Sequence, residues 1–240
     1  MKPINFTFDT IPGLTDYTSD STVMHSALFI IIATEGSNEE IEYVKYVKSL
    51  MKAKSSESFE IVILNEFVTD DKVRIGASNP RQRLDMMLDW KHRQLSILGT
   101  DVVDEDWLIC DRDDASFTEQ QYDQVLQISQ HNNIRVIVSN PAFQLWLLFH
   151  FVDSIDGLNL DSLTTSRERL NIVESELIAH VSDYVHGTID MTKFCDFIND
   201  AINNSRKYSL DPTELKTKCG SNFADLLIDI QDKSQVTLYD

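Results

Sequence analysis

The feature that most constrains the fold is an alternation of short apolar runs with longer segments of helical periodicity. The first run, residues 28–32, reads LFIII, and the next segment places apolar residues at helical spacing. Continuous β-branched runs are typical of strands covered on both faces. We predict strands at residues 28–32, 59–64, 107–110 and 134–138, with helices at residues 38–54, 80–95 and 118–130. Such alternation indicates an α/β fold, a parallel sheet between helices.

The fourth predicted strand is followed by Ser139, Asn140 and Pro141, which resemble a helix start with a capping side chain before a first-turn proline. Residues 143–151 are apolar nearly throughout, so we expect a helix buried on most sides. The rest of the chain predicts helices near residues 165–180, 191–204 and 222–231, without strands. We therefore divide the chain into an N-terminal arm (1–26), an α/β core (27–152) and a helical extension packed on that core (153–240).

Composition excludes several kinds of site. The 240 residues include seven glycines, and no two are spaced for a glycine-rich phosphate loop. The three cysteines form no C-x-x-C pair, and an odd number fits a disulfide framework badly. The longest apolar run, residues 27–33, is far shorter than the ~20 residues of a membrane span. We expect a cytoplasmic protein with no membrane association.

Charge is strongly acidic but uneven. The net charge of −18 argues against broad non-specific binding of nucleic acid, which depends on neutralising phosphates. Residues 72–93 are the exception, with six basic residues against two acidic ones: Lys72, Arg74, Arg81, Arg83, Lys91 and Arg93 against Asp85 and Asp89. This segment could contact a polyanion, or it could be an ordinary solvated helix face.

Carboxylates follow two of the predicted strands. Glu35 comes just after the first, and Asp111, Asp113 and Asp114 end the third. Ligands of parallel sheets bind beyond the carboxyl ends of the strands. An extended D-x-D segment would direct Asp111 and Asp113 to one side, where hard carboxylate oxygens suit Mg²⁺ or Mn²⁺. The simpler alternative is that these aspartates only cap the turn that follows the strand. If the carboxylates converge without a cation, their pKa values should rise.

These motifs occur in an order that resembles the RloB-like family, a branch of the Toprim-like proteins associated with bacterial defence. The resemblance runs from about Ala27 to Phe151, with a looser match near Ser221 and Asn222. Its most specific part is the segment SNPAFQLWLLFHF at residues 139–151. The other matching features are Thr34-Glu35-Gly36, a following helix with Glu40 and Tyr43, and Asp111-Arg112-Asp113-Asp114.

The resemblance implies a Toprim-like fold with a metal site of Glu35, Asp111 and Asp113, and Asp114 is a further candidate ligand. Toprim domains of topoisomerases, primases and overcoming-lysogenization-defect nucleases carry out phosphodiester chemistry with Mg²⁺. This length leaves no room for topoisomerase or primase accessory domains, so a small nuclease is the remaining expectation. Gln144 is a departure, because the family usually has glutamate there.

We therefore expect a Mg²⁺-dependent (or Mn²⁺-dependent) nuclease of anti-phage defence that cleaves RNA, such as transfer RNA, or DNA. Glu35, Asp111 and Asp113 are the candidate catalytic residues. The candidate phosphate contacts are Arg81, Arg83 and Arg112, and the candidate supporting residues are Glu40, Asn140, Gln144 and His150. Arg112 could instead offset the charge of its neighbours. His150 could equally be a hydrogen-bonded core residue, as a lone histidine on an apolar helix usually is.

Two alternatives belong to other classes. A non-catalytic Toprim-like module could sense or regulate by binding a partner such as an ATPase, and the acidic charge and Gln144 favour it slightly. A haloacid-dehalogenase-type phosphotransferase also places two aspartates after a strand. Its motif normally continues with threonine or valine where this chain has Ala115, so this alternative is disfavoured. The sequence does not fix the oligomeric state.

Overall fold

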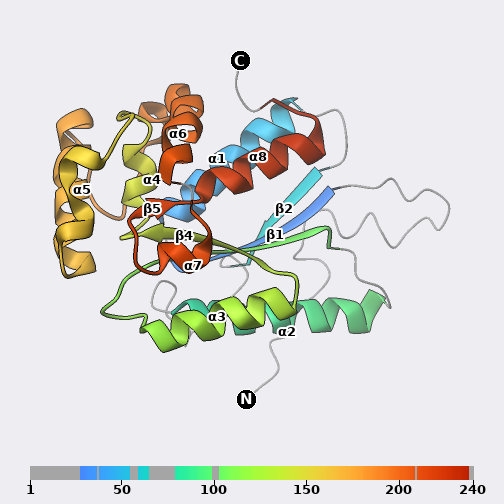
Figure 1. Cartoon of the computed structure of the whole chain (residues 1–240). Helices are drawn as coiled ribbons and strands as arrows, with labels where there is room; N and C mark the ends of the chain where they lie inside the picture. Colours follow the sequence, from blue (N-terminus) through green and yellow to red (C-terminus); the bar gives the residue numbers. More distant parts are fainter. Residues whose placement is uncertain are drawn as a thin grey trace.

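The computed structural model describes residues 28–36, 38–54, 59–64, 79–98, 103–208 and 210–237. The predicted N-terminal arm lies outside these residues. Within them the chain forms a five-stranded sheet with helices on both faces (Figure 1). The predicted fold class, a Toprim-like α/β sheet between helices, is confirmed.

The order of the sheet across the described chain is β2-β1-β3-β4-β5, and the first four strands are parallel. The strands are β1 (Leu28–Thr34), β2 (Phe59–Ile63), β3 (Glu105–Asp111), β4 (Arg135–Asn140) and β5 (Gly220–Ser221). Thr34 is in register with Ile109, and Asp111 with Ser139. The ends of β1, β3 and β4 therefore meet at one edge of the sheet. The short antiparallel strand β5, which pairs with β4, was not predicted.

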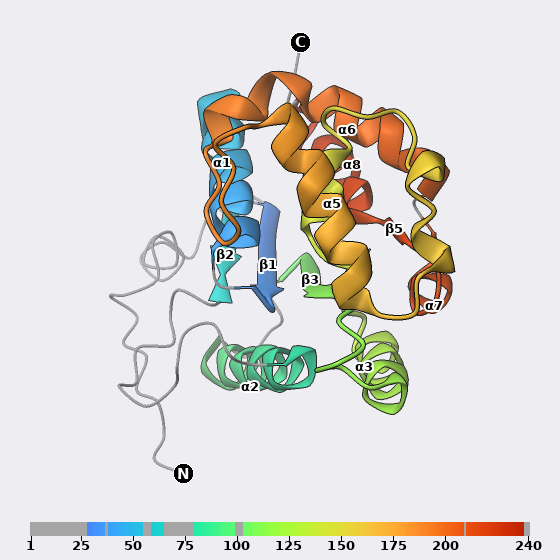
Figure 2. The same cartoon turned by 90° about the vertical axis from the view of Figure 1, so that its left-hand side faces the viewer.

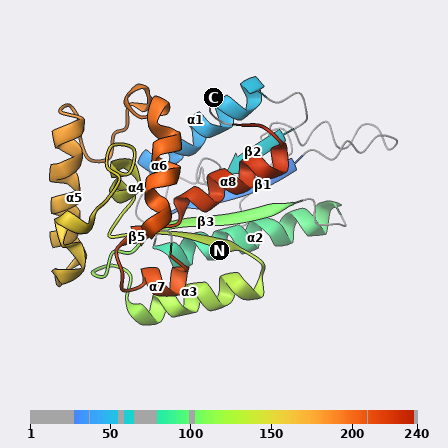
Figure 3. The same ribbon diagram turned by 45° about the horizontal axis from the view of Figure 1, so that its top comes forward.

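Alternate residues of the strands supply two separate cores. Ile30 and Ile32 of β1 pack toward α1, α4 and α8, whereas Ile31 and Ala33 pack toward α2 and α3. Figures 1 and 3 show these two helical layers on opposite faces of the sheet. The helices are α1 (Glu39–Lys54), α2 (Pro80–Leu98), α3 (Glu119–His131), α4 (Gln144–Leu148) and α8 (Phe223–Ser234).

The remaining helical elements follow α4, and α5 lies beside it (Figure 1), on the side of the protein that faces the viewer in Figure 2. They are η4 (Asp156–Leu158), η5 (Leu160–Ser162), α5 (Ser166–His180), η6 (Met191–Lys193), η7 (Cys195–Phe197), α6 (Ile198–Ser205), η8 (Arg206–Tyr208) and α7 (Pro212–Leu215). The helix predicted at residues 191–204 is thus two 3₁₀ turns followed by α6. No helix in the described part of the chain is both long and apolar enough to cross a membrane.

The helix start predicted at Ser139-Asn140-Pro141 is wrong. Ser139 and Asn140 are the last residues of β4, and α4 begins only at Gln144, without a side-chain cap. The polar side chains are used elsewhere: Ser139 Oγ lies 2.9 Å from Ser221 Oγ, and Asn140 Nδ2 donates to the Leu215 carbonyl at 2.8 Å. They join β4 to β5 and α7. All five residues of α4 are buried, as predicted.

Candidate functional site

A polar cavity of about 560 Å³ opens at the carboxyl ends of β1 and β3. It lies where ligands of parallel sheets usually bind. Five carboxyl side chains line it: Glu35, Glu39, Glu40, Asp111 and Asp113. The other described residues of its lining are Gly36, Asn38, Asn79, Gln82, Ser116, Gln144, His186 and Gly187. The three predicted catalytic carboxylates therefore share one cavity.

Glu35 and Asp111 are in direct contact. The Asp111 backbone N–H donates to Glu35 Oε2 at 3.2 Å, and the Glu35 N–H donates to the Ile109 carbonyl at 2.9 Å. Asp111 has the same parity in β3 as Trp107 and Ile109, so its side chain faces the α4 layer. There its Oδ1 accepts a hydrogen bond from the Phe143 N–H at 2.8 Å.

Asp113 lines the same cavity but is held by a turn. Its Oδ1 accepts from the Ala115 N–H and Ser166 Oγ, both at 3.0 Å, and its Oδ2 accepts from Ser116 Oγ at 2.7 Å. The extended D-x-D geometry is wrong because β3 ends at Asp111. Burial acts to raise the pKa of Asp113, but these hydrogen bonds outweigh it and the pKa is lowered. Asp113 is therefore both a turn cap and an ionised cavity group.

Asp114 lies outside the cavity lining. Its carboxylate accepts from the Ser166 N–H at 3.1 Å and from Ser166 Oγ at 2.6 Å. Ser166 is the first residue of α5, where a negative charge interacts favourably with the helix dipole. This position contradicts the predicted role of Asp114 as a metal ligand.

Glu40 enters the cavity wall because of Gly36. A Cβ atom at Gly36 would lie 2.0 and 2.2 Å from the two carboxylate oxygens of Glu40, so only glycine permits this approach. Glu40 is 4% exposed although it lies in the first turn of α1. The predicted supporting role of Glu40 is compatible with this position.

Electrostatics of the cavity disfavour its charged carboxylates. Burial raises the pKa of Glu35 from 4.5 to about 8; the hydrogen bond from Asp111 opposes this rise, and the charges of Glu40 and Asp113 add to it. Burial likewise raises the pKa of Glu40 to about 7. The pKa of Asp111 is well above its usual value, because of burial and then the charges of Glu40 and Glu35. A bound cation would relieve this repulsion.

A second wall of the cavity comes from α4 and the segment after α5. Gln144 Nε2 donates to Glu39 Oε2 at 2.5 Å, and the Tyr184 hydroxyl donates to Glu39 Oε1 at 2.6 Å. His186 Nδ1 lies 2.5 Å from Glu174 Oε1. Sequence reasoning missed Tyr184 and His186, because both lie in a polar loop that carries no periodic or motif signal.

The predicted phosphate contacts are not in the cavity lining, which contains no arginine among the described residues. Arg81 is on the surface and pairs with Asp85 at 3.0 Å. Arg83 is 3% exposed, and its Nε and Nη2 atoms have no hydrogen-bond partner in the described chain. Burial has the largest effect on the pKa of Glu35, and the positive charge of Arg83, a smaller effect, acts to lower it. Arg83 therefore influences the site through the charge of that carboxyl.

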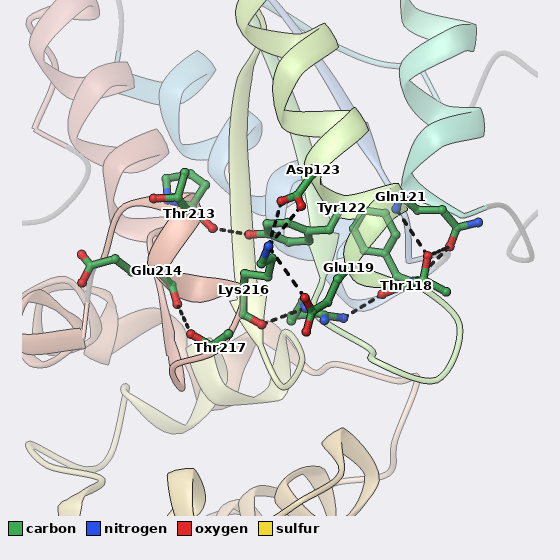
Figure 4. A network of polar contacts seen from close by, with 12 residues as sticks. Thr118, Glu119, Gln121, Tyr122, Asp123, Thr213, Glu214, Lys216 and Thr217 are labelled. Atoms are coloured by element: carbon green, nitrogen blue, oxygen red, sulfur yellow. Dashed lines mark hydrogen bonds and ion pairs between the residues drawn. The ribbon is translucent and has the colours of Figure 1, made fainter.

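Arg112 is a structural residue. It is buried, and it donates from Nη1 to the Phe117 carbonyl at 2.7 Å and from Nε to the Lys216 carbonyl at 3.0 Å. Figure 4 shows the surrounding network, in which Lys216 Nζ also contacts Asp123 of α3. The guanidinium lies 5.4 Å from the centre of the Tyr122 ring. These contacts contradict the predicted phosphate contact and join the end of β3 to α3 and α7.

His150 and Asn140 also serve the fold. His150 is fully buried; its Nε2 lies 3.1 Å from the Tyr43 hydroxyl, and its Nδ1 lies 3.1 Å from the Leu147 carbonyl. Burial lowers the pKa of His150 to about 3, so the ring is neutral. Asn140 is occupied by the Leu215 carbonyl. Neither residue lines the cavity, and their hydrogen bonds described above go to residues outside its lining, so a supporting role stays a prediction.

The donor chemistry of the cavity fits a small divalent cation. Glu35, Asp111 and the ionised Asp113 all offer hard carboxylate oxygens to this cavity. Within the described residues, however, no three Asp, Glu, His or Cys side chains are already gathered closely enough to enclose an ion. Mg²⁺, which usually keeps several waters, requires only one or two protein carboxylates.

Comparison with known protein families gives one match. The family model described as RloB-like protein matches residues 30–230, most of the chain. The chain belongs to the RloB-like protein family. No curated protein and no solved structure matches it. The RloB-like match extends from β1 to α8, so it includes both walls of the cavity and the loop with Tyr184 and His186.

Proposed function

We propose that this RloB-like protein is a nuclease that requires Mg²⁺ or Mn²⁺ and hydrolyses phosphodiester bonds of RNA, such as transfer RNA, or of DNA. The observation that carries the proposal is the contact between Glu35 and Asp111 in an acid-lined cavity. Several carboxyls there have raised pKa values because of burial and mutual repulsion. Carboxyls with strongly perturbed pKa values are concentrated at functional sites, because their burial costs stability.

In the proposed reaction Glu35 and Asp111 would hold the cation, and Asp113 contributes its negative charge from the turn that follows β3. When bound, the cation supplies a Lewis acid that stabilises charge on the phosphate. Glu35 accepts the proton of the attacking water, the general-base role that a carboxylate beside the cation can take. The charge of Arg83, on α2, acts to lower the pKa of Glu35.

The family resemblance supports a role in bacterial anti-phage defence. We place the reaction in the cytoplasm, where the free thiols of Cys110, Cys195 and Cys219 would stay reduced. In this proposal the protein acts on a nucleic acid and binds an ATPase as its partner protein. The net charge of −18 implies that the substrate contacts a small part of the surface.

A specific observation favours the second candidate, a non-catalytic module that binds an ATPase. Both oxygens of Asp113 are already hydrogen-bonded within the turn or to Ser166, and Gln144 replaces the glutamate that the resembled family usually has. On this reading the cavity carboxyls would regulate partner binding through a cation, without cleavage.

Incubation of the purified full chain with RNA and with plasmid DNA separates the two candidates. Each substrate is tested with Mg²⁺, with Mn²⁺ and with EDTA, in the presence and absence of extract from phage-infected cells. We expect metal-dependent cleavage by the wild type and none by Glu35→Gln. If the wild type cleaves neither substrate under any of these conditions, the nuclease proposal is wrong and the binding module is favoured.

A further inference from the structure

The wall of the cavity opposite the predicted metal ligands carries a histidine that the proposed function leaves unused. His186 lies in a short loop closed by the bridge between Val185 and Thr188. The Asn38 side chain, at the start of α1, donates to the Gly187 carbonyl at 3.1 Å and ties this loop to the cavity. The loop therefore holds His186 at the cavity rim, although its side chain is 60% exposed.

The contact with Glu174 fixes the state of the His186 ring. A carboxylate can only accept hydrogen bonds, so Nδ1 must carry the proton that it shares with Glu174 Oε1. The other ring nitrogen, Nε2, is then the atom available for proton transfer. A carboxylate on Nδ1 orients the ring, as in hydrolases that use a histidine–carboxylate pair.

Gln144 connects His186 to the carboxyls of this part of the cavity. Its Nε2 donates to Glu39 Oε2 at 2.5 Å and lies 3.4 Å from His186 Nδ1. The Tyr184 hydroxyl donates to the other oxygen of Glu39 at 2.6 Å. Gln144 and His186 therefore lie side by side in the lining of the cavity that also contains Glu35 and Asp111.

We propose that His186 is the general acid of the phosphodiester reaction, which rests on the proposed nuclease function. The attacking water forms the new P–O bond and gives its proton to Glu35. The P–O bond to the leaving sugar oxygen breaks, and that oxygen takes the Nε2 proton of His186 in its doubly protonated form, while the Nδ1 proton stays with the ring beside Glu174. Glu174 of α5 and Gln144 of α4 contact the His186 ring, and Gln144 and Tyr184 both donate to Glu39 of α1.

The test compares leaving groups. The variant His186→Ala is assayed on an oligonucleotide and on bis(4-nitrophenyl) phosphate, whose acidic phenol leaves without a proton. We expect kcat on the oligonucleotide to fall about 10²-fold or more, the usual contribution of general acid catalysis, while the rate on the phenyl diester stays at its wild-type value. Glu174→Gln should give a smaller loss of the same selectivity. His180→Ala, an exposed histidine on α5, is the matched control and should leave both rates unchanged.

Each other outcome overturns the assignment in a recognisable way. Equal losses on both substrates would show that His186 positions substrate or structure and does not protonate the leaving group. Unchanged rates on both, with Glu35→Gln inactive, would refute the role of His186 and leave the proposed nuclease standing. A wild type inactive on both substrates would refute both proposals. If His186→Ala does not fold in a thermal melt, His186→Gln takes its place in the same comparison.

Discussion

The backbone N–H of Asp111 donates a hydrogen bond to the Glu35 carboxylate across the ends of two neighbouring parallel strands. The contact joins residues 76 positions apart, and the parallel register of β1 and β3 makes it possible. Burial is the main cause of the raised pKa values of Glu35 and Asp111, and this hydrogen bond partly opposes the rise at Glu35. The following expectations depend on this pair and its surroundings.

Asp111→Asn should separate function from stability. The asparagine Oδ1 still accepts from the Phe143 N–H, while a charge that repels Glu35 and Glu40 is removed. We expect metal-dependent cleavage to fall to background. The free energy of unfolding without metal at pH 8 should stay level or rise by about 1 kcal/mol, the value of one pKa unit. Nuclease assays and urea denaturation measure the two effects.

The matched control for that variant is Asp114→Asn. Asp114 directly follows Asp113 in the sequence but does not line the cavity. It should retain cleavage and lose about 0.5–1 kcal/mol of stability, because the charge at the start of α5 is removed. A large loss of stability in Asp111→Asn, with Asp114→Asn harmless, would show instead that Asp111 is a structural residue.

The metal-free protein should become less stable as pH rises from about 5 to 8. Glu35 and Glu40 have pKa values of about 8 and 7 in the folded chain, above the usual 4.5, so the folded state binds more protons in this range. Stability is therefore present below pH 4.5 from these groups and is lost as pH passes through 7 and 8. Each extra proton bound by the folded state gives a slope of at most about 1.4 kcal/mol per pH unit. Solvent screening at the partly exposed Glu35 makes the actual slope smaller.

Urea denaturation at several pH values, with EDTA and with Mg²⁺, measures this slope. Mg²⁺ should stabilise the protein more at pH 8.5 than at pH 6, since the ionised carboxyls bind it. Glu35→Gln should flatten the EDTA curve. A metal-free stability that rises over this range would contradict the assigned direction of the pKa shifts.

Gly36→Ala should displace the Glu40 carboxylate. The new Cβ would overlap the carboxylate oxygens, but these are the far end of a flexible side chain that can shift, so we expect a cost of about 1 kcal/mol, the low end of overpacking. In a Glu40→Ala background that cost should disappear, which a double-mutant cycle of unfolding free energies measures. Gly157→Ala, with nothing near its Cβ, is the control and should change stability by less than about 0.5 kcal/mol. Additive costs of Gly36→Ala and Glu40→Ala would rule out the contact.

His150→Ala should damage the fold and spare the site. It removes a fully buried ring and its hydrogen bond with the Tyr43 hydroxyl, at a cost of about 3 kcal/mol. The fraction that remains folded should cleave at the wild-type rate. Urea denaturation and initial rates corrected for the folded fraction test this. A tenfold lower rate of the folded variant would show instead that His150 contributes to the site.

The four parallel strands could be predicted because each is a continuous apolar run with a helical segment after it. Strand β5 could not, since its two residues, Gly220 and Ser221, pair with β4 from far along the chain and have no period. The start of α4 was misplaced because Asn140 resembles a cap but is used by the Leu215 carbonyl. Local patterns report helix caps only when tertiary partners do not compete for the side chain.

Part of the site could be predicted from the sequence and part could not. Glu35 and Asp111 follow strands, and parallel topology alone brings such positions together. Asp114 and Arg112 lie in the same motif, yet the turn after β3 directs them to α5 and to α7. His186 comes to the cavity through a loop over 70 residues after Asp111, and its only local signal is the turn at Gly187, with φ of +80°.

The most direct test of the central claim is a titration of the metal-free chain with Mn²⁺, followed by electron paramagnetic resonance and calorimetry at pH 8. We expect the wild type and Asp114→Asn to bind Mn²⁺ with the same affinity, and Mg²⁺ to compete. Glu35→Gln and Asp111→Asn should each bind at least about tenfold more weakly. Equal affinity in all four proteins, or no binding by the wild type, would contradict a cation site shared by Glu35 and Asp111.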